Sequence, residues 1–128
     1  MVDKHFTFEK LLVYNKAKDY VLFVYGLLKL FPLEERYAIC DQLRRASVSI
    51  VSNIAEGTCR TSEKEKCHYL DIAYGSLMET YSQLDIAATL HYISDAHLEE
   101  AKTRATEILR LLAGLKKSYS VCEHNCQN

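Results

Sequence analysis

Residues 42–60 read QLRRASVSIVSNIAEGTCR and are followed directly by TSEKEKCHYLDIAYGSLMETYSQLDIA. Leucine, isoleucine and alanine recur through both stretches at helical spacing, which predicts two amphipathic helices. Small and polar side chains interrupt this spacing at Ser47, Ser49, Ser52, Asn53 and Glu56. Such residues compete with the backbone for hydrogen bonds, so packing or a partner must hold them within a helix. The stretch therefore predicts helices that carry a polar stripe.

The composition is that of one compact, soluble domain. Of its 128 residues, 48% are hydrophobic and 26% are charged, and the formal net charge is −1. The longest apolar run, residues 20–28, contains Gly26 and is far shorter than the roughly twenty residues that a bilayer span needs. The N-terminus lacks the apolar segment of a signal peptide. We expect a cytoplasmic protein that has no membrane partner.

Five cysteines argue against a disulfide scaffold, because the number is odd and no CxxC occurs. The terminal CEHNC, Cys122 to Cys126 with His124 between them, could offer soft ligands to a metal, but this spacing does not match structural zinc sites. We therefore expect residues 122–128 to form a disordered tail, and we expect no metal and no cofactor.

Helix-breaking residues are few, with four glycines and one proline, and they fall near the ends of four amphipathic segments. The first segment covers residues 8–30 and stops before Pro32, which cannot continue the hydrogen-bond ladder. The second covers residues 33–55, with Gly57 at the left-handed position that often follows a helix. The third opens with the capping-box pattern of Ser62 and Glu65, and the fourth follows a turn at residues 94–95.

Each segment carries one apolar stripe with steps of three and four residues, which is its predicted core face. The first two stripes consist of Tyr14, Ala17, Val21, Val24, Leu28 and Phe31, and of Tyr37, Cys40, Leu43, Ser47, Ile50 and Ile54. The other two consist of Leu70, Tyr74, Leu77, Tyr81, Leu84, Ala88 and His91, and of Leu98, Ala101, Ala105, Ile108, Leu112, Leu115 and Tyr119. Short connections between such segments predict an all-α, antiparallel up-down-up-down four-helix bundle over residues 1–121.

Catalytic patterns are weak in this sequence. Di-metal bundles carry two Glu-x-x-His pairs, whereas this chain has one, Glu65 with His68, and Glu65 is already explained as a cap partner. No glycine-rich phosphate loop occurs, and no serine or cysteine lies in a nucleophile motif. We expect no catalytic residues, no enzymatic activity and no small-molecule substrate.

The polar stripe is the main candidate site. On the second and third segments it comprises Arg45, Asn53, Glu56, Gly75, Ser76, Glu79 and Gln83. Gly75 costs about 1 kcal/mol relative to alanine inside a helix, which predicts that another group approaches closely there. The favoured interpretation is a structural network in which these side chains satisfy one another across helices or subunits. A small-molecule or nucleic-acid site is the alternative.

Basic residues suggest a further, weaker candidate. Arg44, Arg45, Arg60 and Lys64 lie near the second connection and are the first choice for nucleic-acid contacts, ahead of the lysines and arginines of the fourth segment. A pI of about 6.5 predicts that any such binding is modest and sensitive to salt. Four tyrosines fall outside the predicted core stripes and suit subunit contacts: Tyr20, Tyr25, Tyr69 and Tyr92.

Several blocks together resemble one known family. They are Phe31-Pro32 followed by Glu35, the block from Arg44-Arg45-Ala46 to Gly57-x-x-Arg60, and Gly75-Ser76 with Glu79 and Gln83. The chain is similar to the bacterial four-helix-bundle proteins that are encoded in intervening sequences of large-subunit ribosomal RNA genes. This resemblance implies an up-down bundle with no established catalytic role, assembled as a ring-like homo-oligomer, a pentamer.

Accessory variability determinants of diversity-generating retroelements are related to that family. They are basic bundles that engage a reverse transcriptase and nucleic acid, and this chain differs from them in charge. The sequence thus favours a non-enzymatic, oligomeric interaction protein that associates with ribosomal RNA or a ribonucleoprotein. The alternative is a protein-only scaffold or a reverse-transcriptase accessory that does not bind nucleic acid directly.

Overall fold

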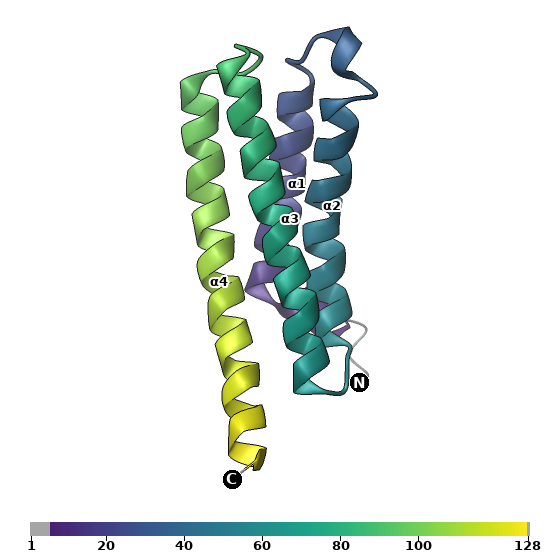
Figure 1. Cartoon of the computed structure of the whole chain (residues 1–128), viewed down its shortest axis with the longest axis vertical. Coiled ribbons are helices and arrows are strands. Elements are labelled where there is room, and N and C mark those ends of the chain that lie inside the picture. Colours follow the sequence, from purple (N-terminus) through teal and green to yellow (C-terminus); the bar gives the residue numbers. More distant parts are fainter. Residues whose placement is uncertain (1–5, 128) are drawn as a thin grey trace.

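The computed structural model describes the backbone of residues 6–127 and the side chains of residues 6–120. Four helices dominate it: α1 (Leu12–Leu28), α2 (Ile39–Thr58), α3 (Glu63–Thr89) and α4 (Asp95–Gln127). Two short 3-10 helices, η1 (Thr7–Lys10) and η2 (Leu33–Glu35), precede α1 and α2, and the described residues contain no strand. Successive helices run in opposite directions along a shared long axis (Figure 1). The predicted all-α four-helix bundle is confirmed.

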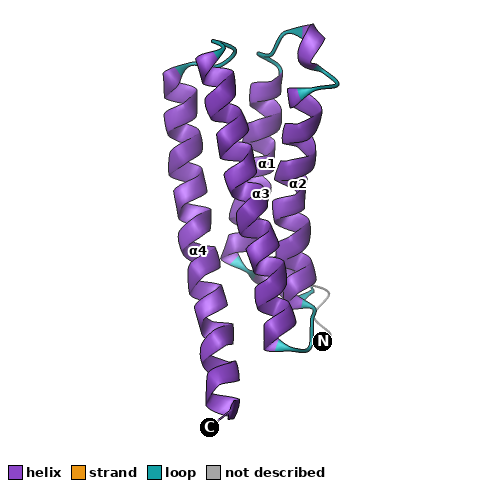
Figure 2. Ribbon diagram, viewed as in Figure 1, coloured by secondary structure: helices purple, strands orange, loops and turns teal. Residues whose placement is uncertain are grey.

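The helices surround a single core in chain order. α2 packs against α1 and α3, and α4 packs against α3 and α1. Only short connections separate the helices (Figure 2). α4 is helical to Gln127, and the expected tail over residues 122–128 falls at its end, outside the described side chains. None of the helices in the described chain is both long enough and apolar enough to cross a membrane.

The first two helices begin later than the sequence predicts. Leu11 is extended and separates η1 from α1, and the Asn15 amide donates hydrogen bonds to the Glu9 and Leu11 carbonyls, both at 3.0 Å. The second predicted helix is divided in the same way, into η2 and α2. Tyr37 lies in the intervening turn and is 86% exposed, so its assignment to the core was wrong.

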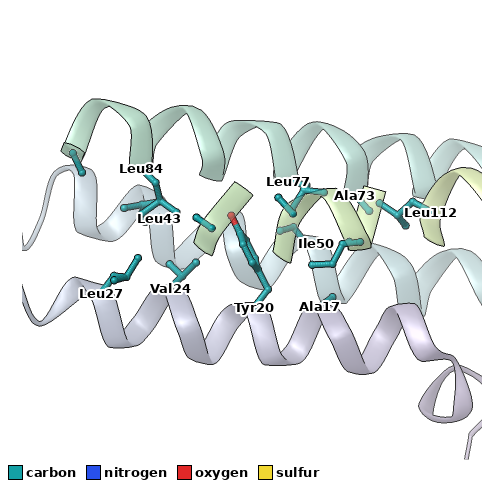
Figure 3. Packing of buried hydrophobic residues seen from close by; sticks show 14 of the residues in the cluster. Ala17, Tyr20, Val24, Leu27, Leu43, Ile50, Ala73, Leu77, Leu84 and Leu112 are labelled. Carbon is teal, nitrogen blue, oxygen red and sulfur yellow. The ribbon is translucent and has the colours of Figure 1, made fainter. Parts of the chain in front are cut away.

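The core face of α1 contains Val13, Ala17, Tyr20, Val24 and Leu27. Figure 3 shows the last four of these in the core. Tyr20 is fully buried, so its predicted place on the surface was wrong. The predicted stripe members Tyr14, Val21 and Leu28 are only partly buried, because they flank this face. Burial of Tyr20 is possible because its hydroxyl lies 2.9 Å from the Thr80 hydroxyl of α3.

The core face of α3 matches its predicted stripe only in part. Leu70, Leu77 and Leu84 are buried as predicted, and the same face also buries Ala73, Thr80, Gln83 and Ala87. Tyr74 is exposed, and His91 lies beyond the end of the helix. His91 has φ of 63°, a left-handed conformation in which the chain turns toward α4. Its side chain is exposed there, so it is not a core residue.

Ser62 and Gly57 test the predicted helix boundaries. Ser62 is the N-cap of α3 and its hydroxyl accepts the Glu65 N–H at 3.0 Å, as predicted. Gly57, by contrast, is buried inside α2 and has a negative φ, so the left-handed assignment was wrong. A Cβ at Gly57 would lie 3.1 Å from the Cβ of Tyr69 and 3.2 Å from the Lys66 carbonyl oxygen. Gly57 therefore permits close approach of α2 and α3.

The two connections at one end of the bundle contact each other. The Phe31 and Tyr92 rings are 5.4 Å apart between centroids, and the Tyr92 hydroxyl donates to the Glu35 carboxylate at 3.2 Å. Tyr92 was predicted to be available for subunit contacts, but its hydroxyl is engaged here within the chain. These contacts join the turn between α1 and α2 to the turn between α3 and α4.

Candidate interaction surfaces

The centre of the predicted polar stripe joins α2 to α3. The hydroxyls of Ser49 and Ser76 are 2.9 Å apart. The Asn53 amide donates to the Ser49 carbonyl at 2.8 Å and to the Ser49 hydroxyl at 3.0 Å. The structure therefore brings Asn53 and Ser76 together through Ser49, in a half-buried seam between two helices.

The charged members of the stripe lie apart from this seam. Arg45 is 82% exposed and pairs with Asp41, whereas Glu56 pairs with Arg60. Glu79 accepts a hydrogen bond from the Gln83 amide at 3.2 Å, and that same amide donates to Gln42 on α2 at 3.1 Å. Within the described chain the two ion pairs are local contacts inside or next to α2, whereas Gln83 makes a second link between α3 and α2. A network across subunits stays a prediction.

Gly75 has more space around it than the sequence suggests. It is exposed on α3, and nothing lies within 4 Å of the position that a Cβ would occupy. Among residues 6–120, the close approach predicted at Gly75 therefore does not occur, and the close glycine contact lies at Gly57 instead.

The four predicted nucleic-acid residues divide between the two ends of α2. Arg44 and Arg45 lie near its first turns, while Arg60 follows its end and Lys64 lies on the first turn of α3. Thirteen helical steps separate Arg45 from the end of α2 at Thr58, about 20 Å at 1.5 Å per residue. Arg60 is also engaged, because its guanidinium stacks 4.7 Å from the Tyr69 ring centre and donates to the Tyr69 hydroxyl at 3.0 Å. The four cations do not form one patch.

A basic pocket lies at the end of the bundle where α1 and α2 are connected. It has a volume of about 340 Å³, and three cations line it from three segments: Lys29, Arg36 and Arg44. Sequence reasoning selected Arg44 but missed the other two. Arg36 lies seven positions after Lys29 and eight before Arg44, and only the path of the turn through Pro32 brings the three cations around one hollow.

An apolar groove runs between α1 and α2 along the side of the bundle. It has a volume of about 430 Å³ and its apolar lining consists of Val21, Leu22, Val48 and Val51. Leu22 is 72% exposed at the groove. A second apolar area lies at the end of α3, where Ile86 and Leu90 are four residues apart and each is 50% exposed. The molecule thus presents two different apolar surfaces.

The side chains described here form no cluster of three or more metal-ligating groups. Cys40 is buried, Cys59 is exposed and Cys67 is partly buried, and all three are free thiols. Burial raises the pKa of the Cys40 thiol, an effect that nearby Arg44 opposes. The CEHNC motif of the terminus lies outside the described side chains.

The profile of the 23S rRNA-intervening sequence protein family matches residues 9–114. The chain belongs to this family. The resemblance seen in the Arg44–Gly57 and Gly75–Gln83 blocks is thereby confirmed. No curated protein sequence matches the chain.

A solved structure shows the same fold as this family member. It is a protein of unknown function from the S23 ribosomal protein family of Bacteroides thetaiotaomicron, which is 26% identical to this chain. The two structures superpose with a TM-score of 0.75, and the match covers 83% of this chain and 99% of the other. The likeness therefore extends over most of this chain and nearly all of the other.

Proposed function

We propose that this chain is a non-enzymatic interaction protein of the cytoplasm, which assembles with copies of itself and contacts RNA or a ribonucleoprotein. The observation that carries the proposal is the pair of exposed apolar surfaces, one in the α1–α2 groove and one on α3. Membership of the 23S rRNA-intervening sequence protein family supports an association with ribosomal RNA.

Two different apolar surfaces favour a ring. When the groove around Leu22 of one copy receives Ile86 and Leu90 of the next, the contact is head-to-tail, and such contacts form a ring when the rotation between successive copies closes. Leucine and isoleucine side chains left in water gain about 25 cal/mol for each Å² that association buries. We propose a pentamer as the closed form.

Sedimentation of the purified protein tests self-association. We expect a single assembled species at micromolar concentration, and we expect Leu22→Glu to convert it to monomers, because a carboxylate cannot be buried unpaired in an apolar groove. The matched control is Leu12→Glu, which alters another exposed leucine outside the groove and should leave the assembly intact. A monomeric wild-type protein would overturn the ring.

RNA contact is testable through its dependence on salt. Binding should be modest and tolerant of sequence, because acidic residues balance the basic ones and no base-reading motif is present. Each single-strand phosphate contact that is lost should flatten the plot of log affinity against log salt by about 0.7. Wild-type protein that binds no RNA at low salt would overturn this part of the proposal.

One observation favours the alternative, a protein-only scaffold or reverse-transcriptase accessory without direct nucleic-acid binding. Two of the four predicted nucleic-acid residues are paired with carboxylates, Arg45 with Asp41 and Arg60 with Glu56. Such pairing lowers the positive potential that attracts phosphates. An assembled ring that binds no RNA would support this alternative.

A further inference from the structure

The cations of the basic pocket differ from the other arginines near α2. Among the residues described, Lys29, Arg36 and Arg44 form no ion pair. Arg44 donates a hydrogen bond to the Arg36 carbonyl at 3.3 Å, which holds the two segments together without neutralising either charge. Three like charges around a hollow of about 340 Å³ repel one another, and a bound anion would relieve that repulsion.

Two nearby carboxylates are already engaged. Asp41 pairs with Arg45 at 3.3 Å, and Glu35 accepts the hydrogen bond of Tyr92. Neither Asp41 nor Glu35 lines the pocket, whose charged lining consists of the three cations alone. The pocket therefore offers positive charge to a ligand from outside the chain.

An aromatic ring lies beside this charge. Tyr25 is 41% exposed and lines the basic pocket together with Arg44. The same two residues also line the adjacent hollow, of about 500 Å³, which includes Arg45 and Ser52. Tyr25 thus stands between two hollows with a cation on either side, and part of its ring is open to a planar group.

We propose that this end of the bundle binds single-stranded RNA, with a backbone phosphate between Lys29, Arg36 and Arg44 and a base stacked on Tyr25. Proteins that hold single strands combine cations that follow the backbone with aromatic rings on which bases stack. A duplex keeps its bases paired and stacked, so none is free to lie on Tyr25. The inference rests on the proposed RNA contact and names its site and the form of RNA.

Fluorescence anisotropy of the full-length protein at low salt tests the site, with a labelled oligouridylate of about twelve nucleotides as the probe. The test variant is Lys29→Gln/Arg36→Gln/Arg44→Gln, and the matched control is Lys102→Gln/Arg110→Gln/Lys117→Gln, which removes the same charge from exposed positions of α4. We expect the test variant to bind at least about tenfold more weakly and the salt slope to fall by about 0.7, the value for the one phosphate contact that is lost. The control should remain near wild type.

Tyr25 supplies an independent readout that does not depend on charge. Tyr25→Ala should weaken binding roughly fivefold or more, whereas Tyr25→Phe keeps the aromatic face and should bind as wild type does. A duplex of the same length should bind more weakly than the single strand and should be insensitive to Tyr25→Ala. These comparisons separate stacking from electrostatic attraction.

The outcomes distinguish this site from the broader function. If wild-type protein binds the oligouridylate but both triple variants weaken it equally, the site is wrong and general RNA contact stands. If the duplex binds as tightly as the single strand, or an acidic peptide competes for the pocket at lower concentration than RNA does, single-strand binding here is wrong. If wild-type protein binds no RNA, both proposals fail.

Discussion

The hydroxyls of Tyr20 and Thr80 meet in the centre of the bundle, 2.9 Å apart, and both residues are fully buried. Thr80 donates its own proton to the Leu77 carbonyl at 2.7 Å, so the Tyr20 hydroxyl is the donor to Thr80. This contact links α1 to α3, which face each other across the core. The only polar end of the Tyr20 side chain is thereby satisfied.

The direction of this hydrogen bond predicts unequal effects of its two deletions. Tyr20→Phe leaves Thr80 bonded to Leu77 and should cost about 0.5 to 1.5 kcal/mol, the usual net value of one hydrogen bond. Thr80→Val leaves the Tyr20 hydroxyl buried without an acceptor and should cost about 1 to 3 kcal/mol. Urea unfolding of both variants measures the difference. A larger loss in Tyr20→Phe would contradict the assigned direction.

Burial also predicts a loss of stability at high pH. Desolvation raises the pKa of Tyr20 from 10.0 to about 12. Between these values the unfolded chain has released the phenolic proton and the folded chain has kept it, so the free energy of unfolding falls as pH rises. Two pKa units correspond to about 3 kcal/mol. The advantage of wild type over Tyr20→Phe should be constant below pH 10, shrink above it and reverse sign before pH 12. A difference independent of pH would refute this.

The two glycines of α2 and α3 predict opposite responses to alanine. Gly57→Ala places a methyl group against Tyr69 and the Lys66 carbonyl, and should lose about 1 kcal/mol after the gain in helix propensity is subtracted. Gly75→Ala meets open space and should gain about 0.5 to 1 kcal/mol. Thermal and urea unfolding test both. Dissociation of the assembly by Gly75→Ala would show that a partner subunit fills that space.

The surroundings of Glu56 predict a small effect on the fold. Its only described contact is with Arg60 on the surface, and exposed ion pairs contribute little. Glu56→Ala should leave the urea midpoint nearly unchanged, whereas Ser49→Ala removes the link to Ser76 and should lose about 1 kcal/mol. If Glu56→Ala instead loosens the fold or dissociates the assembly at two protein concentrations, Glu56 lies in a network between subunits.

The architecture was predictable because the apolar positions of α2 and α4 recur with helical spacing, so that one face of each helix stands out as the core face. Leu43, Ile50 and Ile54 on α2, and Ile108 and Leu112 on α4, are buried as predicted. α1 was harder, because residues 20–28 are apolar on every side and periodicity cannot select one face. Pairing with Thr80 on a distant helix decides that Tyr20 points inward.

The candidate sites were less predictable than the helices, because only some of their residues lie at regular helical spacing. Local spacing identified Asn53 and Ser76, which lie on regular helices and meet across the α2–α3 seam through Ser49. Lys29 and Arg36 gave no such signal, since their proximity depends on the turn after Phe31 and not on a helical repeat. Contacts that depend on a turn of the chain produce no repeating pattern in the sequence, whereas a helix does.

The contact between Phe31 and Tyr92 has a thermodynamic consequence for any ligand of the neighbouring pocket. Phe31 forms part of the pocket wall, and the ring of Tyr92 together with its bond to Glu35 holds that wall in place before a ligand arrives. Binding coupled to folding shows a large negative change in heat capacity. A wall that is already ordered predicts a small one, so calorimetry at several temperatures should give a nearly constant enthalpy of binding.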